Sequence, residues 1–161
     1  MTATNQESSG AAPVLLGLLL VVGLAGCVSP APALPAAGTG DWSVRQGQAV
    51  WCPRRGGPEL AGDLILSTSP SGDFLVEFSK TPLTLVSARR VGARWGVSFP
   101  TEGRRIGGRG AGSDRLLWLR LPDALAGRPV PAPLRFATPA PEGWEMENPR
   151  TGERIEGFLS P

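Results

Sequence analysis

Few side chains in this sequence could do acid–base, nucleophilic or metal chemistry. The 161 residues contain no His and no Tyr, and their two cysteines are Cys27 and Cys52. A catalytic triad built on His and a metal site with His ligands are therefore excluded, and two thiols are too few for a four-cysteine zinc site. We expect no metal and no cofactor.

Carboxylates are the remaining candidates for catalysis, because a suitably spaced pair in a cleft can hydrolyse glycosidic bonds. Seven of them fall in the part of the chain with strand-like patterning: Asp63, Asp73, Glu77, Glu145, Glu147, Glu153 and Glu156. Most of these positions are expected at turns or on exposed strand faces, and no serine lies in a Gly-x-Ser-x-Gly motif. We predict that the protein is not an enzyme and keep an envelope hydrolase as the least favoured alternative.

The Cys27 thiol stands at the end of an apolar run. The uncharged stretch from Ala11 to Gly26 has 16 residues, and its dense apolar part begins at Val14. A membrane-spanning helix needs about 20 apolar residues, so this run is short for a permanent span. Its length and its small final residues are typical of the hydrophobic region of a secretory signal.

Residues 24–27, Leu-Ala-Gly-Cys, resemble the lipobox of bacterial lipoproteins at all four positions. The resemblance implies that Cys27 carries a diacylglycerol thioether and that the bond between Gly26 and Cys27 is cleaved, with further acylation of the new amino group. Two or three acyl chains hold a protein durably on a bilayer, whereas one anchors it only marginally. The segment before the run departs from the usual pattern, since residues 1–10 contain Glu7 and no Lys or Arg.

The resemblance therefore predicts a cell-envelope protein that is lipid-anchored to a bacterial membrane. Val28 follows the cysteine, in place of the Asp that retains lipoproteins in the inner membrane of enteric bacteria, which favours the outer membrane over the inner. Residues 1–26 are the expected signal peptide. Residues 27–40 are the expected lipidated cysteine and a flexible Pro/Ala/Gly tether, and residues 41–161 a single β-rich domain.

Alternation with a period of two predicts strands over most of that domain. Strands are expected at 63–69, 73–79, 83–91, 93–99, 134–137, 143–147 and 153–160. Residues 47–51 fit a short strand or the last turn of a helix, and Ile106 could centre another short strand. The apolar run 115–121 suits a central strand or a packed helix, with the strand favoured, and 122–127 a single helical turn. The predicted fold is mainly β: an antiparallel sheet curled into a half-open barrel, with one or two short helical turns.

Bulky residues gather on the expected strands, and a curled sheet turns such a face into an apolar trough. The candidates for binding an apolar ligand there are Phe74, Phe78, Trp95, Phe99, Trp118 and Trp144. The order of GDLILSTSPSGDFLVEF, a basic strand, a Trp-bearing strand and WLRLPDALAG resembles the LolA/LolB group of lipoprotein carriers and receptors. That resemblance implies a half-open barrel that cradles acyl chains.

Arginines make the middle of the domain basic, and strand alternation could place them on one outer face. The candidates for contact with anionic lipid headgroups or a glycan phosphate are Arg89, Arg90, Arg94, Arg104 and Arg105, and the alternative is a solvated sheet face. The glycine-rich segment 107–112 lacks the Gly-Lys-Ser/Thr of a phosphate-binding loop. The formal net charge of +2 gives no indication of a nucleic-acid partner.

Together these patterns predict a non-enzymatic envelope lipoprotein that binds an acyl chain or a lipoprotein on the concave face of its sheet. The alternative is a structural or assembly lipoprotein that scaffolds another envelope protein through its sheet edges and loops.

Overall fold

The computed structural model describes residues 41–139 and 143–160. The predicted signal peptide, the lipidation of Cys27 and the tether lie outside the described residues. Among the described residues, every buried residue of the hydrophobic core lies between Ala49 and Ile155. A chain that begins at residue 41 therefore contains all of these core residues.

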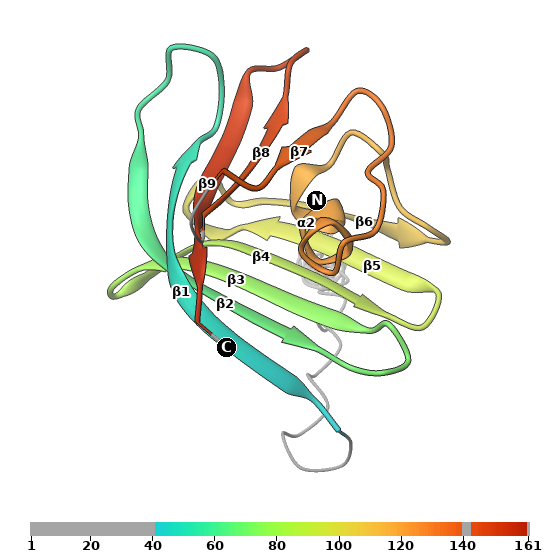
Figure 1. Ribbon diagram of the computed structural model, residues 1–161. Helices are drawn as coiled ribbons and strands as arrows, with labels where there is room; N and C mark the ends of the chain where they lie inside the picture. The colour runs from blue at the N-terminus through green and yellow to red at the C-terminus, as the bar shows by residue number, and fades with distance from the viewer. Residues whose placement is uncertain (1–40, 140–142, 161) are drawn as a thin grey trace, which may run out of the picture. The chain divides into compact units, whose positions relative to one another are not determined.

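The described residues form one antiparallel sheet of nine strands, in the order β6-β5-β4-β3-β2-β1-β9-β8-β7 (Figure 1). The strands are β1 (Ser43–Cys52), β2 (Leu60–Thr68), β3 (Phe74–Lys80), β4 (Leu83–Val91), β5 (Arg94–Phe99), β6 (Arg104–Arg109), β7 (Arg135–Ala137), β8 (Trp144–Asn148) and β9 (Glu153–Leu159). A 3-10 turn, η2 (Pro100–Glu102), links β5 to β6, and the helix α2 (Leu117–Leu125) links β6 to β7. The mainly β fold predicted from the sequence is confirmed.

Alternation sorts side chains onto two faces of the sheet, as predicted. In β3, the buried residues Phe74, Val76 and Phe78 point to the inner face and alternate with partly exposed neighbours. Leu64 and Leu66 of β2 pair with Phe78 and Val76 and share that face. The inner face is therefore mostly apolar, whereas the outer face carries mostly polar side chains.

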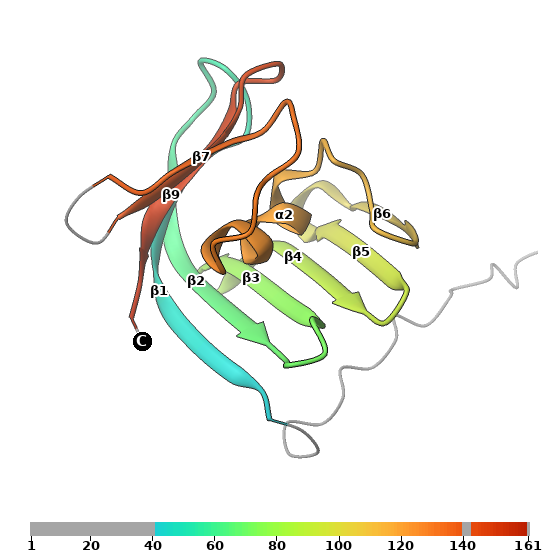
Figure 2. The same ribbon diagram turned by 45° about the vertical axis from the view of Figure 1, so that its right-hand side comes forward.

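The sheet curls but does not close, because β6 and β7 lie at opposite ends of the strand order and do not pair with each other (Figure 2). A register shift between Phe78 and Ser79 bends the β3–β4 pair.

Gly62 faces inward, where the ring of Phe78 lies 3.1 Å from the place that a Cβ atom would occupy. The missing side chain thus lets the ring and the neighbouring strand approach closely.

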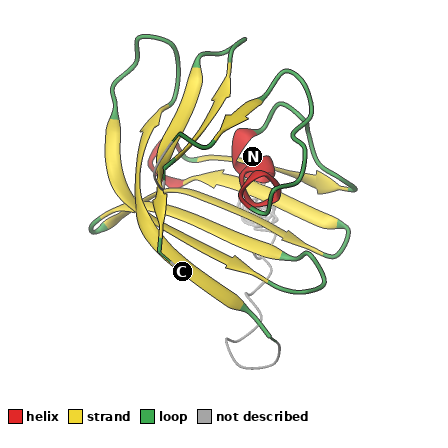
Figure 3. Ribbon diagram, viewed as in Figure 1, coloured by secondary structure: helices red, strands yellow, loops and turns green. Residues whose placement is uncertain are grey.

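Helix α2 lies on the concave face of the sheet, with strands on both sides of it (Figures 2 and 3). The strand favoured for residues 115–121 was therefore wrong, and the single turn predicted for 122–127 is the second half of α2. Seven of its nine residues are buried, Arg120 among them, so most of the helix surface is covered. A short apolar run of this kind carries no periodicity that separates a buried strand from a buried helix. Gly127, at φ +73°, follows the helix end, as expected.

Most other boundaries lie within a few residues of the predicted ones, and β4 matches its predicted range at both ends. Residues 47–51 belong to the ten-residue strand β1, so the helical alternative for them was wrong. The strand expected around Ile106 is β6, which pairs with β5 along its whole length. Its two glycines and three arginines had made this segment resemble a loop.

Candidate functional site

The centre of the concave face is a cluster of four aromatic rings from four different elements. Trp118 of α2 lies edge-on to Trp51 of β1, with ring centroids 5.5 Å apart, and 5.7 Å from the centroid of Phe78. Trp51 also stacks on Phe99 of β5 at 6.1 Å and 25°. Since β1 and β5 are not neighbours in the sheet, this contact spans the inside of the curl. Sequence reasoning missed Trp51, although its spacing of two from Ala49 is that of inward positions on a strand.

The six aromatic residues predicted to bind a ligand all face the inside of the curl. Five of them are at most 5% exposed, and Trp95 is half-buried; the five are Phe74, Phe78, Phe99, Trp118 and Trp144. Trp118 comes from the helix instead of a strand. In this conformation the set is packed as a core against α2, so a ligand that touches these rings must take the place of the helix.

Polar contacts of α2 to the sheet and to its own flanks gather on Asp123. Its carboxylate lies 3.4 Å from Arg90 Nη2 of β4 and 3.8 Å from Arg120 Nη1, and it also forms an ion pair with Arg128.

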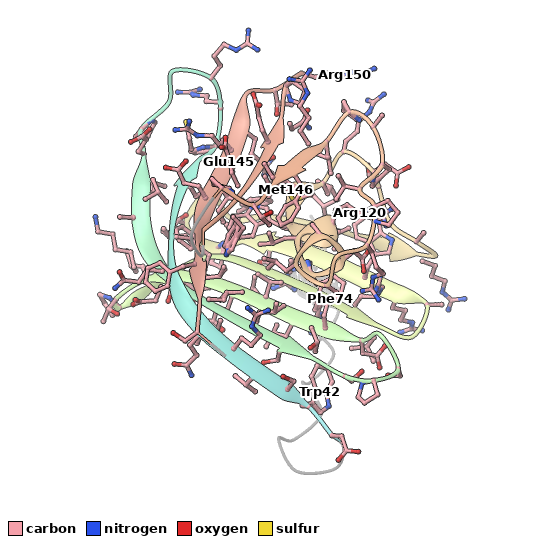
Figure 4. All side chains as sticks on the ribbon, viewed as in Figure 1. Trp42, Phe74, Arg120, Glu145, Met146 and Arg150 are labelled. Atoms are coloured by element: carbon pink, nitrogen blue, oxygen red, sulfur yellow. The ribbon has the colours of Figure 1, made fainter. Side chains whose placement is uncertain are left out.

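Arg90 further lies over the ring of Phe74, 4.9 Å from its centroid, and donates to the Gly72 carbonyl oxygen at 2.9 Å. In Figure 4, Phe74 lies beside α2, from which Arg120 projects. Arg120 also pairs with Asp114, which precedes the helix.

Several buried polar atoms around α2 have no hydrogen-bond partner among the described residues. They are the Nε1 atoms of Trp95, Trp118 and Trp144 and Nε of Arg120. A buried donor left without a partner costs about 1–3 kcal/mol. The free energy of docking α2 on the sheet is therefore less favourable than burial of its apolar surface alone would make it.

Glu153, at the start of β9, is the one predicted carboxylate that faces inward. Trp51 Nε1 donates a hydrogen bond of 3.2 Å to its Oε1. Trp118 Nε1 lies near the same carboxylate but does not meet hydrogen-bonding geometry. Burial raises the pKa of Glu153 above its ordinary value of 4.5, and the Nε1–H groups of Trp51 and Trp118 and the charge of Arg104 oppose that shift only in part.

The other predicted carboxylates lie on the outer face or at turns. Asp73 accepts hydrogen bonds from Gly92 N at 2.7 Å and from the Ser71 hydroxyl, so it organises two turns. Asp63 and Glu156 line a shallow pocket of about 520 Å³ on the outer side of β9, β1 and β2, beside Phe158. Glu77, Glu145 and Glu147 occupy outward strand positions.

The arginines predicted to share one outer face are divided between the two faces. Arg90 and Arg104 point inward, and Arg104 lies over the Phe99 ring, 4.1 Å from its centroid, while it pairs with Glu102 at 3.1 Å. Arg89, Arg94 and Arg105 point outward, as does Arg109. Successive side chains of a strand point to opposite faces of the sheet. Arg89 and Arg90 are successive residues, and so are Arg104 and Arg105, so each pair is divided between the two faces.

The described ranges contain no group of three or more His, Cys, Asp or Glu side chains that could hold a metal ion. Cys52 is half-buried and free, and its thiol lies 3.1 Å from the Arg54 carbonyl oxygen. No helix in the described part of the chain combines the length and apolar character needed to cross a bilayer. In comparisons with known proteins, no family model and no curated protein matches this sequence.

Proposed function

We propose that this protein is a lipid-anchored envelope protein that binds an apolar ligand, an acyl chain or the acyl part of a lipoprotein, on the concave face of its sheet. The observation that carries the proposal is the pairing of the apolar concave face of an unclosed sheet with one nine-residue helix of the described chain, which covers that face. Ligand pockets are mostly apolar, with few polar groups that fix orientation.

The ligand would take the place of α2 against the aromatic cluster. Three features support a helix that can leave: it is short, its N-cap residue Leu116 makes no side-chain cap, and Trp118 and Arg120 keep buried donors without partners. The inner faces of β2 to β5 supply a floor of Leu, Val and Phe side chains for the ligand. The gap between β6 and β7 leaves the curl open on one side.

A titration of the 41–161 chain with a fluorescent fatty acid tests the ligand-binding part. We expect saturable binding with a change in tryptophan fluorescence, because Trp51 and Trp118 would lose their mutual contact. Limited proteolysis in the presence of ligand should then cut the segment around α2. Absence of saturable binding would remove the carrier proposal.

The anchor is tested separately, on the full chain. Intact mass of the membrane-extracted protein should show cleavage before Cys27 and acyl chains on that residue. A Cys27→Ser variant should stay unprocessed at this site and lose the mass of the acyl chains. Identical processing and identical membrane extraction of both chains would contradict the lipid anchor.

A second candidate is an assembly lipoprotein that holds another envelope protein through a sheet edge. It is favoured by β6, a six-residue edge strand with two glycines, whose outer backbone groups have no strand partner among the described residues. Edges of this kind accept an added strand. Pull-down from membranes separates the two candidates, since a stoichiometric protein favours assembly and co-purified lipid favours the carrier.

A further inference from the structure

The outer face of β4, β5 and β6 is the most strongly basic part of the described sheet. These three strands contain six arginines and no acidic residue. Four of the arginines, Arg89, Arg94, Arg105 and Arg109, point outward. The outer faces of β2, β3, β8 and β9 carry acidic side chains instead, which are Asp63, Glu77, Glu145, Glu147 and Glu156. The outward acidic side chains of the described sheet thus lie on strands other than β4, β5 and β6, whereas outward arginines occur on both parts, as Arg135 and Arg154 show.

Strand register arranges this patch as three rows across the sheet. The first row is Ser87, Ser98 and Arg105, the second is Arg89, Gly96 and Gly107, and the third is Val91, Arg94 and Arg109. The centre therefore carries no side chain, and guanidinium groups surround it. A Cβ atom added to Gly96 would meet only the Ile106 carbonyl oxygen, at 3.6 Å, so the space above the centre is open.

This arrangement is unfavourable for the isolated domain. Arg94 and Arg109 are directly opposite each other on neighbouring strands, and like charges at such positions destabilise a sheet. Arg94, Arg105 and Arg109 are exposed, and none of them forms an ion pair within the described part of the chain. Guanidinium groups around an open floor, with two serine hydroxyls beside them, match the oxygens of phosphate esters, which arginine binds in bidentate fashion.

We infer that the outer face of β4–β6, defined by Arg89, Arg94, Arg105 and Arg109, docks on the anionic phospholipid headgroups of the membrane to which the protein is tethered. The inference goes beyond the proposed ligand binding and rests only on the proposed membrane anchor. The 14 residues from 27 to 40 span at most about 50 Å, so an anchor at Cys27 keeps the patch close to the bilayer. Val91, 44% exposed at the rim of the patch, adds an apolar side chain that can enter the headgroup layer.

Vesicle co-sedimentation of the 41–161 chain tests the inference without the anchor. We expect binding to vesicles of phosphatidylcholine and phosphatidylglycerol, little binding to phosphatidylcholine alone, and a steep loss with added salt. The triple variant R94Q/R105Q/R109Q should lose roughly a hundredfold in partitioning, since each basic residue at an anionic surface contributes about fivefold. The control R54Q/R135Q/R150Q removes the same charge from exposed positions off the patch and should lose far less.

Two substitutions at Gly96 provide a second test that leaves every arginine in place. Gly96→Glu puts a carboxylate at the centre of the patch and should reduce vesicle binding strongly, whereas Gly96→Gln, of nearly equal size, should retain most of it. Thermal unfolding of each variant checks that the fold is kept.

Three outcomes would overturn the inference: no preference for anionic vesicles, an equal loss in the two triple variants, or displacement from vesicles by millimolar inorganic phosphate that shows a free-anion site. Binding to an acidic polypeptide but not to vesicles would likewise replace the membrane with a protein partner. Fatty-acid binding by R94Q/R105Q/R109Q should be unchanged. Failure of the headgroup inference and failure of the ligand proposal are therefore seen in different assays.

Discussion

Arg90 of β4 and Asp123 of α2 face each other across the concave side of the sheet, with Nη2 and Oδ1 3.4 Å apart. The pair joins the middle of the sheet to the helix that covers it. Asp123 is 15% exposed and also contacts Arg120 and Arg128, so one carboxylate serves three guanidinium groups.

Asp123→Asn should loosen α2. One buried, one half-buried and one exposed guanidinium group would lose their shared carboxylate, and we expect the free energy of unfolding to fall by about 1–3 kcal/mol. Asp114→Asn is the matched control, because Asp114 is 57% exposed and pairs with Arg120 alone. Asp114→Asn should lower the free energy of unfolding by less than about 1 kcal/mol. Urea denaturation measures both, and equal losses would contradict the central role of Asp123.

The same variant also tests the proposed function. If a fatty acid binds where α2 lies, the helix must undock first, and the energy of undocking reduces the apparent affinity. Asp123→Asn should therefore bind the fluorescent fatty acid more tightly than the parent chain, while Asp114→Asn should resemble the parent. Weaker binding by Asp123→Asn would show that the ligand does not displace the helix.

Trp118→Ala should destabilise the domain by about 3–5 kcal/mol, because the ring fills the space between Trp51 and Phe78. Trp118→Phe keeps a ring in that place and removes the unpartnered Nε1 donor, so it should cost less than about 1.5 kcal/mol. Chemical denaturation monitored by circular dichroism provides the comparison. An unchanged unfolding midpoint for Trp118→Ala would exclude α2 from the stable core.

Glu153 should make stability decrease as pH rises. Its pKa is higher in the folded protein than its ordinary value, so the folded state holds this proton more tightly than the unfolded state does. The resulting contribution to stability is fully present below the unfolded pKa and is lost as pH rises through the folded pKa. Glu153→Gln removes this dependence and can still accept the Trp51 hydrogen bond, so it should be the more stable chain at pH 7.

Thermal melts of both chains at pH 4 and pH 7 check this expectation. The difference between Glu153→Gln and the parent should be larger at pH 7 than at pH 4. Glu145→Gln, at an outward position on β8, is the control and should show no such pH dependence. A parent chain that gains stability relative to Glu153→Gln on raising the pH would contradict the sign of the shift.

Gly62→Ala should disturb the curl of the sheet. The added methyl would lie 3.1 Å from two atoms of the Phe78 ring and closer still to the Ser79 carbonyl oxygen, so the strand or the ring must move. We expect a loss of roughly 1–3 kcal/mol. Gly96→Ala is the control, since its nearest neighbour is 3.6 Å away, and it should change stability by less than about 0.5 kcal/mol. Equal melting temperatures would show that the strands can part at Gly62 without cost.

The sequence alone was sufficient for seven of the nine described strands, because inward and outward residues alternate wherever one face is buried, whereas its pattern left β1 and β6 open. Phe74, Val76 and Phe78 identified both β3 and its inner face, and Trp144 with Met146 did the same for β8. Pro, Gly and Asn separated the segments, since these residues favour turns. The local pattern thus fixed the mainly β class and most strand boundaries.

Only the tertiary structure decided what occupies the curl. The run 115–121 has Leu or Trp at five of its seven positions, and such a run fits a central strand as well as a buried helix until its surroundings are known. The arginines differ: strand alternation already sends adjacent residues such as Arg89 and Arg90 to opposite faces. Only the tertiary structure decided that Arg90 joins the ion pairs of α2 and Arg89 the outer patch. Which face is inside, and what covers it, depends on contacts between residues far apart in the chain, and no local spacing encodes them.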